Sequence, residues 1–190
     1  MGKRTYSRNR RKSTSSIRFG VMKLRFSKIK DNDIANGLGI TMSFWTQGCP
    51  HHCKGCFNQE TWDYEGGKEF TNYELDYIID NINKNSINRD LSILGGEPLC
   101  TQNVEGVIEL CREFKRFYPN KKIYLWTGYT IENFNETQKE VLEYIDVLID
   151  GKFEEENKNL SIMLRGSSNQ RVIDVKKTIR EDKLTLYEVC

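Results

Sequence analysis

The sequence lacks the features that place a protein in a membrane or on a secretion pathway. Its 190 residues contain no apolar run close to the roughly 20 residues needed to cross a bilayer. No apolar segment followed by small residues marks a secretory signal near the first residue. With 37% hydrophobic and 29% charged residues, we expect a globular, cytoplasmic protein without a membrane partner.

A large excess of one charge is also missing, since the formal net charge is only +2. Residues 1–20 nevertheless carry seven Lys or Arg and no acid, so the rest holds 22 of the 29 basic and all 27 acidic residues. Such a basic arm can touch nucleic acid or an acidic partner, although an extension without structure is the simpler interpretation. We predict residues 1–21 as a basic extension and 22–190 as a single domain, mildly acidic and without a nucleic-acid partner.

Strand and helix signals alternate after residue 22 and predict an α/β fold. The helices are expected from a capping box at Thr71 and Glu74 through Ile82, over 104–114 and over 135–144. The strands are expected at 24–26, 40–46, 91–94, 122–127 and 147–149, with weaker candidates at 172–175 and 184–189. Alternation indicates parallel βαβ units, too few for a full eightfold barrel. We therefore expect an open partial barrel with mostly parallel strands, whose carboxyl ends meet at one rim.

Three of the six cysteines, Cys49, Cys53 and Cys56, lie within eight residues with the spacing C-x3-C-x2-C. In a chain without a secretory signal this argues against a disulfide framework. Three thiolates can bind three irons of a 4Fe–4S cluster and leave the fourth iron open, whereas ferredoxin clusters use four cysteines. Zinc is the alternative, because His51 and His52 lie in the same loop, but the chain has no second Cys/His pair. The spacing alone favours the cluster by a modest margin.

The triplet together with the Gly-Gly-Glu turn at 95–97 resembles the radical S-adenosylmethionine (SAM) superfamily. More closely, the chain resembles the anaerobic ribonucleoside-triphosphate reductase-activating proteins. The segments that carry this resemblance are 33–37, 47–51, 55–58, 61–62, 95–99, 126–129, 146–153 and 165–171. The chain departs from the family at Leu38, where a proline is usual, and the superfamily's aromatic residue before the third cysteine is replaced by Gly55.

The resemblance implies one-electron chemistry on SAM. SAM would bind the open iron through its amino and carboxylate groups and be cleaved to methionine and a 5′-deoxyadenosyl radical. That radical would take a hydrogen atom from a glycine of anaerobic ribonucleoside-triphosphate reductase, with a low-potential donor such as flavodoxin or ferredoxin supplying the electron. The chain has no evident general base or activated nucleophile, which fits chemistry that depends on positioning.

The resemblance also assigns residues. Cys49, Cys53 and Cys56 would hold the cluster. The candidate SAM contacts are Gly55, Cys56, Phe57, Gly95, Gly96, Glu97, Asp150 and Lys152, with the Gly-Gly-Glu turn at the amino end of SAM. Asp150 and Lys152 are equally well explained as an ordinary surface turn, and loop 165–170 as a docking loop or a loop beside SAM. Two other functions stay open: activation of a different glycyl-radical enzyme of the formate-lyase type, and a non-enzymatic zinc-binding module.

Overall fold

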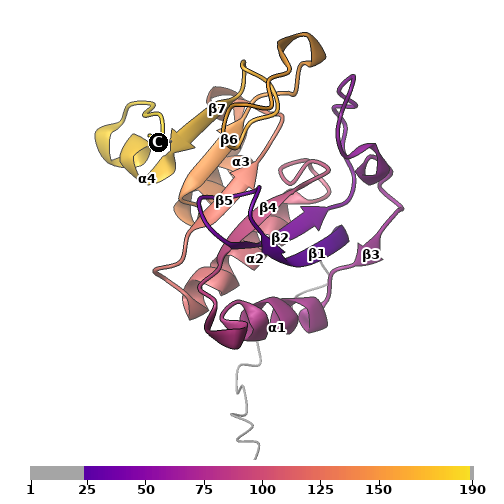
Figure 1. The fold of residues 1–190 in the computed structure, drawn as a ribbon, viewed down its shortest axis with the longest axis vertical. Helices are drawn as coiled ribbons and strands as arrows, with labels where there is room; N and C mark the ends of the chain where they lie inside the picture. Colours follow the sequence, from indigo (N-terminus) through magenta and orange to yellow (C-terminus); the bar gives the residue numbers. More distant parts are fainter. Residues whose placement is uncertain (1–23, 189–190) are drawn as a thin grey trace, which may run out of the picture.

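A seven-stranded sheet organises the protein in a computed structural model that describes residues 24–188 (Figure 1). The strand order is β3-β1-β2-β4-β5-β6-β7. The strands are β1 (Arg25–Asp33), β2 (Thr41–Thr46), β3 (Lys68–Glu69), β4 (Asp90–Gly95), β5 (Ile123–Trp126), β6 (Val147–Asp150) and β7 (Arg171–Asp174). The central strands β2, β4, β5 and β6 are parallel, as predicted, whereas β1, β3 and β7 pair antiparallel.

The sheet is open, since its linear order leaves β3 and β7 at opposite edges of the described chain. Figure 1 shows this progression, with α4 beside β7 at the far end from β1 and β3. Within residues 24–188 no helix is long and apolar enough to cross a bilayer. The predicted basic extension, residues 1–21, lies outside the described residues.

The helices follow the predicted capping signals more closely than the predicted lengths. They are α1 (Asn72–Asn81), α2 (Val104–Phe117), α3 (Glu136–Glu140) and α4 (Val175–Glu181). The capping box of α1 is confirmed: Thr71 accepts a hydrogen bond from the N–H of Tyr73, and Glu74 accepts one from the N–H of Thr71. The helix expected over 135–144 is split into α3 and a 3₁₀ turn, Val141–Glu143.

The end of the described chain agrees only in part with the sequence-based expectation. The strand expected over 172–175 is confirmed as β7, but it ends at Asp174. Val175 instead begins α4, which Asp174 caps by accepting a hydrogen bond from the N–H of Lys177 at 2.8 Å. The strand expected over 184–189 reduces, within residues 24–188, to an isolated bridge between Leu186 and Ile173. Residue 189 lies outside the described range.

Alternation along the central strands divides the sheet into two faces. One set of side chains is buried in the core with α1 and α2: Met42, Phe44, Leu91, Ile93, Ile123, Leu125 and Leu148. Met42 and Phe44 share this face as predicted, whereas Ile40 precedes β2 and is exposed. The opposite set, which includes Trp45, Leu94 and Trp126, lines a cavity. We call this second side the cavity face.

The segment 34–39 covers part of the cavity face. Leu38 packs against a cluster that contains Tyr124. The buried carboxylate of Asp33 accepts hydrogen bonds from the Asn36 amide at 2.7 Å and from the Ser43 hydroxyl at 2.5 Å. Leu38 therefore has a packing role in this chain.

Candidate metal and cofactor site

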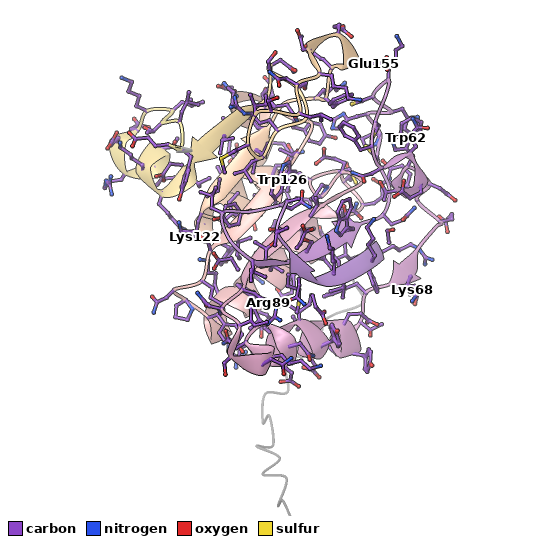
Figure 2. All side chains as sticks on the ribbon, viewed as in Figure 1. Trp62, Lys68, Arg89, Lys122, Trp126 and Glu155 are labelled. Carbon is purple, nitrogen blue, oxygen red and sulfur yellow. The ribbon has the colours of Figure 1, made fainter. Side chains whose placement is uncertain are left out.

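A cavity of about 500 Å³ lies at the carboxyl ends of the parallel strands. This volume suits a nucleoside-sized ligand. The lining includes all three clustered cysteines and the turn 95–97, so the structure brings together the two motifs that the sequence singled out. Figure 2 labels two further lining residues, Trp126 at the end of β5 and Trp62 in the loop before β3.

The cysteine loop is held by backbone hydrogen bonds that use no sulfur atom. The N–H of Gly48 donates to the carbonyl of Thr61 at 2.8 Å, and the N–H of Cys49 to the carbonyl of Trp62 at 3.2 Å. Cys49 is buried and Cys53 half-buried, and desolvation raises the pKa of the Cys49 thiol to about 11 and that of Cys53 above its ordinary value. A bound metal would offset this desolvation and favour the thiolate forms of Cys49 and Cys53.

All three clustered cysteines belong to the cavity lining. Among residues 24–188 no three His, Cys, Asp or Glu side chains are placed to hold a single metal ion. A zinc ion requires sulfur ligands about 2.3 Å from one centre. In a 4Fe–4S cluster each thiolate binds a different iron, so the three sulfur atoms need not converge on one centre.

The two histidines have other partners. The Nε2 atom of His51 lies 2.9 Å from Oε2 of Glu97, and the ring of His52 stacks on Trp62 at 4.6 Å between centroids. Both contacts fit the interpretation that the histidines belong to the loop and are not metal ligands.

The Glu97 carboxylate ties three strand-end loops together. Oε1 accepts from the N–H of Leu99 at 2.9 Å and from the hydroxyl of Thr127 at 2.7 Å. Oε2 accepts from the N–H of Gly128 at 2.7 Å and is the partner of His51. The side chain is 1% exposed and its oxygens are surrounded by donors. The predicted contact to the amino group of SAM stays a prediction, and this geometry gives the carboxylate a different task.

The two glycines before Glu97 let the loops approach each other. Gly95 has a φ of +111°, and a Cβ on Gly96 would lie 2.4 Å from the carbonyl oxygen of Gly48. The sequence suggested that glycines allow a ligand to approach closely. The structure adds that they allow the turn 95–97 to pack on the cysteine loop.

Asp150 and Lys152 do not line the cavity, whereas Gly151 between them does. The Asp150 carboxylate is fully buried, accepts from the N–H of Ile131 at 2.9 Å and pairs with the guanidinium of Arg171 at 2.5 Å. Asp150 is therefore not part of an ordinary surface turn, because its buried carboxylate joins the turn to β7 and to the start of the segment 131–133. The predicted contacts of Asp150 and Lys152 to SAM stay predictions.

The other predicted SAM contacts lie near the cysteine loop. Cys56 and Phe57 line the cavity, and Phe57 packs against Phe153 at 5.1 Å between ring centroids. Gly55 is not among the lining residues of the described chain and instead adopts a φ of +70° beside Glu155. Phe57 is 54% exposed, so its ring reaches the mouth of the cavity.

Loop 165–170 forms one wall of the cavity, which the sequence alone did not establish. Loop 165–170 contributes Arg165, Gly166 and Gln170 to the lining. The indole N–H of Trp126 donates to the carbonyl of Leu164 at 2.8 Å and fixes the start of this loop. Nothing in its polar, compact sequence indicated which way it faces.

Comparisons with known proteins agree with this geometry. Residues 35–173 match a family described as a 4Fe-4S single cluster domain. A protein of Escherichia coli is 41% identical over 141 residues, which cover 74% of this chain and 92% of that protein. A protein of Vibrio cholerae is 41% identical over 139 residues, which cover 73% of this chain and 90% of that protein. A protein of Enterobacteria phage T4 is 38% identical over 151 residues, which cover 78% of this chain and 93% of that protein. All three are named anaerobic ribonucleoside-triphosphate reductase-activating protein.

The chain belongs to this family. The predicted resemblance to the anaerobic ribonucleoside-triphosphate reductase-activating proteins is thereby confirmed. The match to a 4Fe-4S domain spans all three clustered cysteines, which counts against a zinc-binding module. The names of these relatives give no support to a formate-lyase type of activating protein.

Proposed function

We propose that this chain holds a 4Fe–4S cluster on Cys49, Cys53 and Cys56, binds SAM beside it, and generates a glycyl radical on anaerobic ribonucleoside-triphosphate reductase. One observation carries the proposal: the three cysteines and the turn 95–97 line the same cavity. Three protein ligands leave one iron of the cluster for a small molecule. The relatives' names supply the partner.

In this proposal the residues of the chain bind the cluster, orient SAM and shield the reacting atoms from water. The thiolates of the three cysteines would hold the cluster, which when bound supplies the electron that cleaves SAM to methionine and a hydrogen-abstracting 5′-deoxyadenosyl radical. The backbone of Gly95 and Gly96 and the side of Cys56 would orient SAM, with the Phe57 ring against adenine. Trp45 and other apolar lining residues keep water away from the reacting atoms.

The mouth of the cavity suits a macromolecular substrate. Phe57 and Leu160 belong to the lining yet are 54% and 69% exposed. A glycine-bearing loop of the reductase would enter here and complete the enclosure of an open, partial radical SAM barrel. A low-potential donor such as flavodoxin or ferredoxin and a cytoplasmic location are parts of the same proposal, since thiolate ligands need a reducing compartment.

Anaerobic reconstitution tests the cluster and SAM chemistry. Wild type should bind four irons per chain, absorb broadly in the visible, and release 5′-deoxyadenosine with SAM and a strong reductant. Cys53→Ala should lose all three properties. The matched control is Cys111→Ala, because Cys111 is fully buried on α2 in the helix-side core. One bound zinc without visible absorption, or 5′-deoxyadenosine release by Cys53→Ala, would refute the proposal.

Electron paramagnetic resonance of the reductase tests the partner. A glycyl-radical signal should develop in anaerobic ribonucleoside-triphosphate reductase only with this protein, SAM and reductant present. The signal should be absent with Cys53→Ala and retained with Cys111→Ala. An active cluster that produces no radical in the reductase would contradict the assignment of the partner.

A further inference from the structure

Residues that line the cavity carry hydrogen-bond donors without partners. In residues 24–188 four buried side-chain nitrogen or oxygen atoms lack a hydrogen bond, and three of them belong to the cavity lining: Trp45 Nε1, Trp62 Nε1 and Arg165 Nε. Indole and guanidinium groups donate hydrogen bonds and cannot accept them. Because buried donors are rarely left unpaired, these three indicate a ligand rich in acceptor oxygens.

Arg165 also has no charge partner in the described part of the chain. Its printed contact is a long one, from Nη1 to the carbonyl oxygen of Gln170 at 3.4 Å, and none of the ion pairs found among residues 24–188 includes it. The acidic residue in the cavity lining is Glu97, whose oxygens already accept from donors on three loops. The positive charge of Arg165 is therefore left for a ligand.

The loop that carries Arg165 is braced. The side-chain oxygen of Gln170 accepts from the N–H groups of Gly166 at 2.8 Å and Ser167 at 3.2 Å, and its amide donates to the carbonyl of Gly151 at 3.0 Å. On the other side, Leu164 is held by the indole of Trp126. A loop whose backbone is held on both sides of Arg165 loses little backbone freedom on binding, which favours a preformed ligand contact.

We propose that Arg165 binds the carboxylate of SAM, with the indole N–H groups of Trp45 and Trp62 as further donors to SAM oxygen atoms. This inference rests on the proposed function. The carboxylate is the negatively charged group of SAM, and the guanidinium fork matches it in shape and charge. Arg165 is then a specificity residue that favours SAM over analogues without a carboxylate, a task that the sequence pattern assigned to no residue.

Two ligands and three variants test this role. Dissociation constants are measured on the reconstituted holoprotein for SAM and for decarboxylated SAM, which lacks only the carboxylate. Arg165→Met should weaken SAM roughly 10- to 100-fold, the range of a charge-assisted hydrogen bond, and decarboxylated SAM by less than about threefold. Arg165→Lys should fall in between, because it keeps the charge without the fork. The control is Arg180→Met, since Arg180 is exposed on α4.

The outcomes separate this inference from the proposed function. Equal weakening of both ligands would show that Arg165 only holds its loop, and unchanged SAM affinity in Arg165→Met would show that it makes no contact; either result overturns the inference alone. Failure of the wild-type holoprotein to bind SAM would overturn the proposed function as well. Visible absorption and thermal unfolding verify that each variant is folded and loaded. If Arg165→Met does not load, the same two-ligand comparison on Arg165→Lys decides.

Discussion

Substituting Glu97 by Gln should destabilise the apoprotein strongly, although the side chain keeps its shape. In either orientation of the new amide, its NH₂ group faces one backbone N–H, that of Leu99 or that of Gly128. That N–H loses its acceptor inside the protein, and the remaining bonds lose their charged partner. Leaving a buried donor unsatisfied and weakening charge-assisted bonds together cost about 3 kcal/mol. For a chain of this length the melting temperature should fall by roughly 6–12 °C.

Thermal unfolding of the metal-free protein followed by circular dichroism measures this effect. The control is Glu65→Gln, because Glu65 is exposed and its substitution should leave the melting temperature within about 2 °C of wild type. If Glu97→Gln melts like the control yet the loaded protein no longer binds SAM, the carboxylate contacts the cofactor directly. That result would refute the conclusion that Glu97 acts by joining loops.

Two other changes have defined outcomes. Gly96→Ala should prevent cluster loading, measured as bound iron, because the added Cβ would meet the Gly48 carbonyl. The control is Gly39→Ala, because no atom lies within 4 Å of a Cβ added at this position. Its φ of +110° strains an alanine, so this variant should lose about 1 kcal/mol of stability and still load the cluster. Hydrogen bonds from Arg171 lower the pKa of Glu132 from 4.5 to about 2, so this pair stabilises the fold above pH 4.5 and loses that effect as the pH falls toward 2. Glu132→Gln should therefore flatten the fall of the melting temperature between pH 5 and 3, and an unchanged slope would contradict the pairing.

Local sequence signals predicted the parts of the fold that depend on neighbouring residues. The capping box at Thr71 lies within four residues, and it located the start of α1. The alternation that buries Met42 and Phe44 can likewise be recognised within the sequence of a single strand, β2. The cap of α4 at Asp174 was missed because β7 is short and its apolar run continues into Val175, which reads as strand.

The spacing of residues in the sequence did not predict the contacts between distant segments. Asp150 ends a strand at the rim, where a ligand contact is a reasonable expectation, but its partner Arg171 lies 21 residues later. Glu97 follows two glycines as the family pattern requires, yet its donors come from the loops after β2, β4 and β5. The direction of Arg165 depends on Gln170 and on the end of β5, which spacing does not encode.

The anchoring of the cysteine loop has a consequence for how the protein matures. Every backbone bond that holds Gly48 and Cys49 in place, including the one from the Glu97 N–H to the Gly48 carbonyl at 2.8 Å, is made without iron or sulfur. Folding and metal insertion are then separable events, in contrast to small zinc domains that unfold when metal is removed. We expect the chain to stay folded through loss of its cluster in air, so that a damaged molecule can be repaired in place and used again.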